Sequence, residues 1–260
     1  IKNRGAKFVS INPVRTGYNA IADEWVGIRP GTDGLFVGAL IYELVRTQNV
    51  DIDYQIRYTN APWLVIRNKG GPDDGLFARD KDGNPLAYDV DKKKLVNALL
   101  PDIAPALSGE FKLSKGRKAV PALQLLIERF TSKEYAPATV AEETGVPAKD
   151  IERIAAELAH AAFEEEVVLD IPWTDWAGRR HEKMIGRPVS MHAMRGISAH
   201  SNGFHTCRMI HILQILLGSI DCPGGWASRW VRKICSSMTS SARSASTRRS
   251  VGMRRSPPTE

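Results

Sequence analysis

The chain has 260 residues, of which 43% are hydrophobic and 25% are charged, enough for one substantial core or two modest ones. This composition excludes collagen-like, coiled-coil and wholly disordered polymers, and the absence of any run of 18 apolar residues excludes a predicted membrane span. The net charge of +7 lies in the last 34 residues, because residues 1–226 hold 28 basic and 28 acidic side chains.

Strand, turn and helix signals alternate in the first 46 residues. Residues 7–11 (KFVSI) predict a short strand ending at an Asn-Pro turn. Residues 29–33 (RPGTD) predict a tight turn in which Thr32 or Asp33 caps the next helix. Apolar residues then recur at helical spacing over residues 34–46. This order of elements is typical of an α/β fold.

The middle of the chain predicts several short elements. Residues 51–59 indicate a short helix or turn, and residues 63–67 a strand. Clusters of Gly, Pro and Asp within residues 70–91 bracket residues 76–79 and predict a surface hairpin. Residues 121–130 predict a helix with proline in its first turn.

Residues 137–159 predict two helices joined by a turn, with Gly145 at the left-handed C-cap and Pro147 at the start of the second helix. A helix–turn–helix of this kind could read DNA, but the second helix begins Ala-Lys-Asp-Ile-Glu, and these acids would repel phosphates. The pattern therefore favours a structural helical hairpin. Further on, residues 167–171 predict a buried strand and residues 203–217 a strongly apolar helix.

Residues 227–260 differ from the rest of the chain. They contain nine serines, seven arginines and a single acid, without apolar periodicity, so we expect a disordered tail. The tail could be a basic arm that binds nucleic acid, or the translation of a shifted reading frame. We favour the second interpretation because the chain before Gly225 is neutral and well patterned; coding DNA that resumes a patterned frame there would test it.

Two stretches carry more specific motifs, and the first is GAKFVSINPVRT (residues 5–16) followed by ADEWVGIRPGTD (residues 22–33). It resembles the molybdopterin oxidoreductases of the dimethyl sulfoxide reductase family, in which a strand ends in Asp/Asn-Pro-x-x-Thr/Ser and Arg-Pro-Gly-Thr-Asp opens a helix. A helix start with free amides suits phosphate, and a carboxylate can accept from a guanine edge. The residues that the resemblance assigns to one guanosine diphosphate arm of a bis-pterin cofactor, and to its pocket, are Asn12, Arg15, Thr16, Arg29, Gly31, Thr32 and Asp33.

The second stretch runs from PWTDW (residues 172–176) through MHAMRGISAHSNGFHTCR (residues 191–208) to a Pro-Gly-Gly turn at residues 223–225. It resembles the branch of the family that contains sulfite dehydrogenases and tetrathionate, thiosulfate and polysulfide reductases. The resemblance places Arg195 near molybdenum as the catalytic arginine, where its planar fork would pair with a sulfite-like oxyanion. It also assigns cofactor contacts to His200, Asn202 and Gly203.

No metal site is expected within this chain. The four histidines between residues 192 and 211 lack an HExxH motif or an i, i+4 pair on one helix face. The three cysteines lack CxxC spacing, which disfavours a zinc site, an iron–sulfur site or a disulfide framework.

The resemblance covers residues 1–225, but the family's iron–sulfur cysteine motif, its molybdenum-ligand loop and its C-terminal domain are absent from the sequence. It implies an internal fragment, itself inactive, of the catalytic subunit of a parent enzyme that carries molybdenum bis(molybdopterin guanine dinucleotide) and an iron–sulfur cluster. The implied reaction is redox chemistry of a small sulfur oxyanion, sulfite first. The implied partners are a membrane anchor subunit and an iron–sulfur electron-transfer subunit, and no nucleic-acid partner is expected. The implied location is cytoplasmic and membrane-associated through these subunits, with the periplasm as the open alternative.

The expected architecture is α/β, with parts of two domains of a bis-pterin molybdoenzyme. We divide the chain into a nucleotide-binding-like segment (residues 1–60), a hairpin insertion with helices (61–165), a cofactor-loop and apolar-helix segment (166–226) and the Ser/Arg-rich tail (227–260). Two alternatives stay open: a non-catalytic nucleotide-binding module, and a nucleic-acid binder that uses the basic tail.

Overall fold

The structure is a computed structural model that describes residues 5–15, 17–175, 178–193 and 195–226. The predicted disordered tail therefore lies outside the described residues, as does Thr16. The fold mixes helices and short strands, as expected for the α/β class. Among the described residues, no helix combines the length and the hydropathy that crossing a membrane requires.

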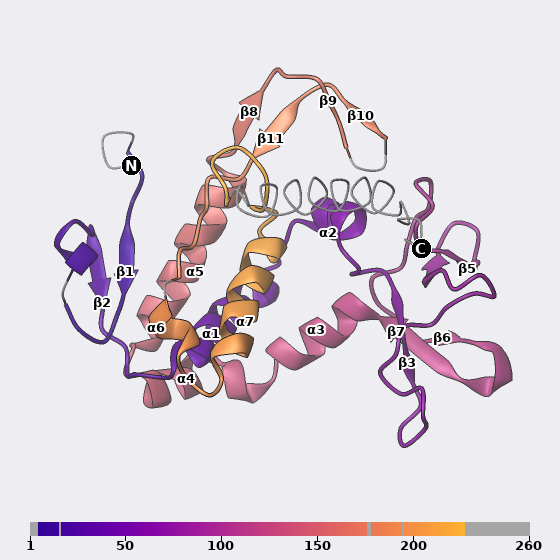
Figure 1. Ribbon diagram of the computed structural model, residues 1–260, viewed down its shortest axis with the longest axis horizontal. Helices are drawn as coiled ribbons and strands as arrows, with labels where there is room; N and C mark the ends of the chain where they lie inside the picture. Colours follow the sequence, from indigo (N-terminus) through magenta and orange to yellow (C-terminus); the bar gives the residue numbers. More distant parts are fainter. Residues whose placement is uncertain (1–4, 16, 176–177, 194, 227–260) are drawn as a thin grey trace, which may run out of the picture.

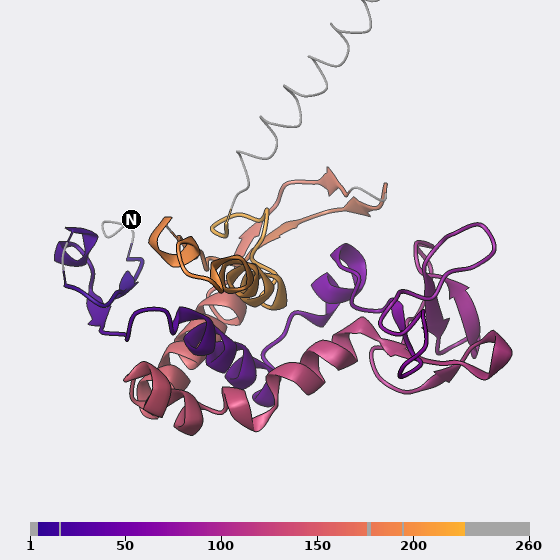
Figure 2. The same cartoon turned by 60° about the horizontal axis from the view of Figure 1, so that its bottom comes forward.

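The helices form the middle of the molecule, between a small strand pair and a strand-rich part (Figures 1 and 2). Their bounds are α1 Asp33–Arg46, α2 Ile52–Tyr58, α3 Ala122–Phe130, α4 Pro137–Thr144, α5 Ala148–Phe163, α6 Arg195–Ser198 and α7 Gly203–Leu216. Central α1 packs against α3, α4, α5 and α7. Its apolar residues, among them Phe36, Ile41 and Leu44, are almost completely buried in the main core.

Close packing around α1 depends on one glycine. A Cβ atom on Gly38 would lie 2.3 Å from the ring of Tyr135 and 3.0 Å from the terminal methyl of Met209. Tyr135 precedes α4 and Met209 belongs to α7, so Gly38 lets two neighbouring segments approach α1 together. The turn between α4 and α5 is as predicted, with Gly145 in the left-handed conformation at a φ of 76°.

The strands form small separate sheets rather than one large sheet. β1 (Val9–Ile11) pairs in parallel with β2 (Glu24–Val26), and all other named pairs are antiparallel. The antiparallel strands are β3 Leu64–Arg67, β4 Leu86–Asp89, β5 Lys94–Asn97, β6 Phe111–Lys112, β7 Lys118–Pro121, β8 Val167–Leu169, β9 Trp173–Thr174, β10 Arg180–His181 and β11 Met184–Gly186. The largest described sheet has three strands in the order β3-β7-β6.

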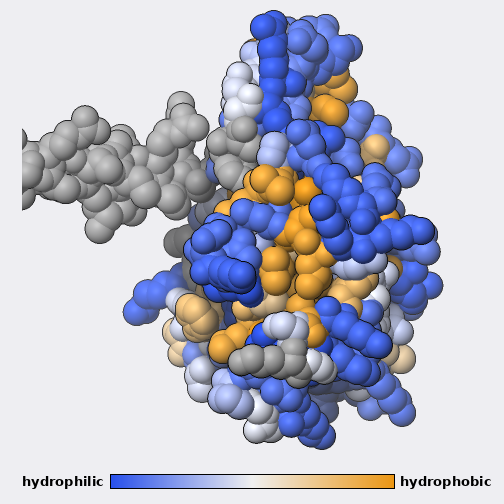
Figure 3. All heavy atoms as spheres, turned by 90° about the vertical axis from the view of Figure 1, so that its right-hand side faces the viewer, coloured by the Kyte–Doolittle hydropathy of each residue, from blue (hydrophilic) through white to orange (hydrophobic). Residues whose placement is uncertain are grey.

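The strand-rich part, β3 to β7, has its own small core of Leu64, Ile66, Ala78, Leu113 and Ala119. Its outer face carries a hollow of about 360 Å³, and Figure 3 shows apolar side chains gathered there inside a hydrophilic rim. The predicted surface hairpin around residues 76–79 is only partly right. This segment lies along β3, where the N–H of Ala78 donates to the carbonyl of Leu64 at 2.8 Å and Ala78 is buried.

The predicted strand at residues 167–171 is confirmed for Val167–Leu169, but its predicted burial is wrong. β8 pairs with β11 in a two-stranded arm that projects from the helices (Figure 1). Val168 is 47% exposed and Ile171 is 51% exposed. On the partner strand β11, Ile185 is 49% exposed. An apolar β-branched run predicts burial only if a second layer covers it, and no other described strand pairs with β8.

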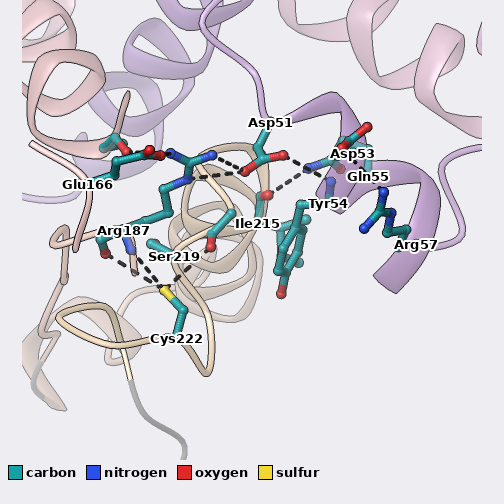
Figure 4. A network of polar contacts seen from close by, with 12 residues as sticks. Asp51, Asp53, Tyr54, Gln55, Arg57, Glu166, Arg187, Ile215, Ser219 and Cys222 are labelled. Carbon is teal, nitrogen blue, oxygen red and sulfur yellow. Dashed lines mark hydrogen bonds and ion pairs between the residues drawn. The ribbon is translucent and has the colours of Figure 1, made fainter. Parts of the chain in front are cut away.

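A polar network fastens this arm to the ends of α2, α5 and α7 (Figure 4). The guanidinium of Arg187 donates to Asp51 at 3.0 and 3.2 Å, to Glu166 at 2.6 Å and to the carbonyl of Ala162 at 3.1 Å. The backbone N–H of Arg187 donates to the thiol sulfur of Cys222 at 3.2 Å. Burial raises the pKa of this thiol, which keeps it neutral in its structural position.

Candidate functional site

Two motifs 171 residues apart meet at the N-terminal ends of α1 and α7. The side-chain amide of Asn202 donates to the carbonyl oxygen of Gly31 at 3.4 Å. The imidazole Nδ1 of His200 lies 3.6 Å from the position that a Cβ atom would take on Gly31. One turn further on, Thr206 of α7 packs against Gly34 of α1, with its hydroxyl oxygen 2.9 Å from the corresponding Cβ position. The RPGTD motif and the histidine-rich loop therefore form one surface.

The start of α1 is not capped as the sequence predicts. Thr32 occupies the N-cap position, but its hydroxyl donates to the carbonyl of Arg29 at 2.8 Å and makes no capping hydrogen bond. Gly31 precedes it with a φ of 79°, a conformation that favours glycine. A helix start without a side-chain cap presents backbone N–H groups to an anion, and Asp33 stands at its first position.

The start of α7 also lacks a side-chain cap. Asn202 is the N-cap residue and likewise makes no side-chain capping bond. Behind it, a Cβ atom on Gly203 would lie 2.4 Å from the carbonyl oxygen of Ser198, so only glycine allows α6 and α7 to approach this closely. Two helix N-termini thus converge, and both macrodipoles favour negative charge between them.

Side-chain charge reinforces this field. Residues 191–220 contain no Asp or Glu, while they include two arginines and four histidines. Arg195 begins α6, only five residues before His200, and is exposed. Among the described residues, no group of three His, Cys, Asp or Glu side chains could hold a metal ion.

Asn12 and Arg15 belong to a second group, around Trp25. The side-chain oxygen of Asn12 accepts from the N–H of Val14 at 3.0 Å, and its carbonyl accepts from the indole N–H of Trp25 at 2.9 Å. The guanidinium carbon of Arg15 lies 5.9 Å from the centre of the indole ring. The loop after β1 is thus tied to β2.

Arg29 has structural partners. Its guanidinium donates to the carbonyl oxygens of Glu142 at 2.6 Å and Glu143 at 3.2 Å, at the C-terminal end of α4. A cation here stabilises the negative end of the helix dipole. The predicted contact between Arg29 and a cofactor stays a prediction, and the structure gives the side chain a different set of contacts.

Sequence reasoning did not single out three residues that shape these groups. Ser10 and Asn19 form a buried hydrogen bond, and the amide of Asn19 donates to the carbonyl of Val14 at 2.7 Å, which closes the loop from the other side. Trp25 is the third. Their only sequence signal was their position in and beside the first motif, because their roles depend on contacts between separate segments.

Comparison with known proteins agrees with the motifs. No protein-family model matches this chain. Over 234 residues it is 43% identical to a sulfite dehydrogenase subunit of Allochromatium vinosum, covering 86% of this chain and 24% of that protein. It is 24% identical over 231 residues to the formate dehydrogenase-O major subunit of Escherichia coli, covering 86% and 19%. It is 25% identical over 242 residues to a selenate reductase subunit of Mesobacillus selenatarsenatis, covering 84% and 20%.

The motifs and the relatives together place this chain in the class of the molybdenum oxidoreductases. The chain belongs to the dimethyl sulfoxide reductase family of molybdopterin oxidoreductases, as the motifs predicted. It spans about a fifth to a quarter of the length of these curated relatives. Among solved structures, acetylene hydratase from Pelobacter acetylenicus aligns with a TM-score of 0.48 at 18% identity, covering 86% of this chain and 19% of that one.

Proposed function

We propose that this chain forms part of the pocket for molybdenum bis(molybdopterin guanine dinucleotide) in the catalytic subunit of an enzyme that acts on a sulfur oxyanion, with sulfite oxidation as the first candidate. The 43% identity to a sulfite dehydrogenase subunit supports this substrate class. The observation that carries the proposal is the meeting of the α1 and α7 N-termini through Asn202 and Gly31.

The residues present fit a large anionic cofactor. Two helix starts without side-chain caps supply N–H donors, and the acid-free stretch around α6 and α7 adds positive charge. The carboxylate of Asp33 at the start of α1 would face the guanine edge rather than a phosphate. Gly203 lets the end of α6 pack against the start of α7, and Gly31 lies beside His200, so the two motifs share one surface. We assign phosphate contacts to the starts of the two helices, and contacts to the guanosine diphosphate arm to Asn12, Arg15 and Thr16.

When bound, the molybdenum centre would supply oxygen-atom transfer coupled to two electrons. In the proposed reaction sulfite and water yield sulfate, two protons and two electrons. Arg195 would hold the oxyanion, because its guanidinium fork matches the oxygens of sulfite in a bidentate pair. His200 and Asn202 would fix the loop that carries the substrate-facing end of α6, since both lie against Gly31.

We also propose that the electrons leave through an iron–sulfur cluster of the parent catalytic subunit to an iron–sulfur partner protein. The complex would then be held at the cytoplasmic face of the membrane by an anchor subunit. The names of the relatives support a multi-subunit complex in general, since those compared are named as single subunits of their enzymes.

The test is to purify the full-length catalytic subunit that contains this chain from a host that makes molybdopterin, because a chain that spans about a quarter of its relative is expected to be inactive alone. Molybdenum is measured by mass spectrometry, and guanosine monophosphate released by acid hydrolysis reports the dinucleotide form. Sulfite-dependent reduction of an artificial acceptor is then compared with formate oxidation and selenate reduction. Protein without molybdenum or pterin would refute the cofactor assignment, whereas loaded protein that turns over formate or selenate but not sulfite would refute the substrate class.

A further inference from the structure

Trp25 joins the two sequence-predicted residues of the Asn12–Arg15 loop. Its indole N–H donates to the carbonyl oxygen of Asn12 at 2.9 Å, and the guanidinium carbon of Arg15 lies 5.9 Å from its ring centre. One ring therefore holds a backbone group through its edge and a cation near its face, the arrangement favoured by the indole quadrupole.

The six-membered ring of the indole lies close to Gly27. A Cβ atom on Gly27 would lie 3.1 Å and 3.2 Å from two carbons of the Trp25 ring. Any side chain at Gly27 would displace the ring, so this glycine leaves room for it. Trp25 is still 37% exposed, which is high for a large aromatic side chain placed only to fill a core.

The rest of the loop is held from its other end. Ser10 and Asn19 form a buried pair, and Asn19 donates to the carbonyl of Val14 at 2.7 Å. These contacts fix the backbone of the loop but do not reach the guanidinium of Arg15. A long arginine side chain at the surface has many rotamers, and Trp25 is the described group that restricts them.

We infer that Trp25 is a positioning residue for anion recognition, acting through Arg15, and that it orients this guanidinium toward the guanosine diphosphate arm of the cofactor. This inference rests on the proposed function, in which Arg15 contacts that arm. Restricting the rotamers of Arg15 before binding reduces the entropy that the complex must lose, so Trp25 contributes to affinity without touching the ligand.

The experiment uses the protein from a host that cannot make molybdopterin, with guanosine diphosphate as the probe in titration calorimetry. We expect Arg15→Ala and Trp25→Leu each to weaken binding about fivefold. Because both remove the same interaction, the double variant should also bind about fivefold more weakly, whereas independent effects would give about 25-fold. Trp25→Phe keeps an aromatic face but loses the N–H and the five-membered part of the indole, so its loss of affinity should be smaller.

Trp173→Phe is the matched control. The indole N–H of Trp173 donates to the carbonyl of Lys183 at 3.0 Å, so this variant removes an equivalent bond in the β9–β10 hairpin. It should leave affinity for guanosine diphosphate unchanged. Salt dependence provides a second readout: Arg15→Ala and Trp25→Leu should both flatten the fall of affinity with salt, which a purely structural tryptophan would not do.

Additive losses in the double variant would overturn the inference, and so would Trp25 variants that bind as wild type does. Wild-type protein that does not bind guanosine diphosphate overturns it as well. The proposed function is judged separately, by the molybdenum and guanosine monophosphate content of protein from the molybdopterin-producing host. Circular dichroism and thermal melts identify any variant that fails to fold, and Trp25→Phe then replaces Trp25→Leu in the cycle.

Discussion

Arg187 directs two guanidinium nitrogens at one carboxylate oxygen of Asp51, at 3.0 and 3.2 Å, although the residues are 136 positions apart. Both side chains are mostly buried, at 16% and 13% exposure. The other oxygen of Asp51 accepts from the N–H of Tyr54 and caps α2 at 3.0 Å. This one carboxylate therefore holds the β8–β11 arm and starts a helix.

Replacing Asp51 should cost more stability than a typical ion pair would. We expect Asp51→Ala to lower the free energy of unfolding by about 3–4 kcal/mol, of which the lost helix cap accounts for about 1 kcal/mol. Asp51→Asn keeps a capping oxygen and should lose less. Urea denaturation measures both. The control is Arg180→Ala, which breaks an exposed ion pair with Glu182 and should lower the free energy of unfolding by under about 0.5 kcal/mol. If Asp51→Ala costs no more than this control, Asp51 does not hold the arm and the helix together.

Gly38→Ala should destabilise the helical core. In an exposed helix alanine is about 1 kcal/mol better than glycine, but here its Cβ would lie 2.3 Å from the Tyr135 ring. Because of this overpacking, we expect Gly38→Ala to lower the free energy of unfolding by about 1–3 kcal/mol rather than to raise it. Thermal melting checks this. Gly196→Ala is the matched substitution, because a Cβ there meets nothing within 4 Å, and it should be neutral or slightly stabilising.

The β9–β10 hairpin should loosen in acid. Burial acts to raise the pKa of Asp175, but hydrogen bonds from the backbone and side chain of Arg179 and from His181 outweigh it and lower the pKa to about 2. A depressed carboxyl pKa stabilises the fold above the ordinary value of 3.8, and this contribution is lost as the pH falls through about 2.

Fluorescence of Trp173, whose ring stacks on His181 at 4.6 Å, reports the opening of this hairpin. With the other tryptophans replaced by phenylalanine, its emission should change between about pH 4 and pH 2 as Asp175 becomes protonated. Asp175→Asn removes the titrating group, so that transition should disappear. A transition that persists in Asp175→Asn would assign the acid sensitivity to another group.

Arg195→Ala should lower kcat/KM for the oxyanion substrate more than it changes the reaction with the electron acceptor. In the loaded enzyme we expect kcat/KM for sulfite to fall about 10- to 100-fold, with Arg195→Lys falling less because it keeps the charge but loses the fork. The KM for the artificial acceptor and the molybdenum content should stay unchanged. Arg180→Ala, at an exposed arginine of the hairpin, serves as the control. Equal losses for both substrates would show that Arg195 does not recognise the oxyanion.

Local patterns in the sequence by themselves determined much of the helical framework. Apolar spacing placed α1 and α7 within one residue at each end, and the Thr-Gly-Val-Pro turn located the junction of α4 and α5. Helical periodicity and a left-handed glycine depend on neighbouring residues, so they are legible without knowledge of the fold. The two family motifs were legible for the same reason.

Only the tertiary structure decided which residues meet. The exposure of β8, the contact of Arg29 with the end of α4 and the contacts of Trp25 depend on the relative positions of separate segments. The hydrogen bond from Thr32 to Arg29 depends on local backbone geometry, which residue type does not dictate. The meeting of Asn202 with Gly31 spans 171 positions. The packing of whole helices around α1 brings such distant residues together. A local sequence pattern does not predict that packing, because it depends on residues far away in the chain.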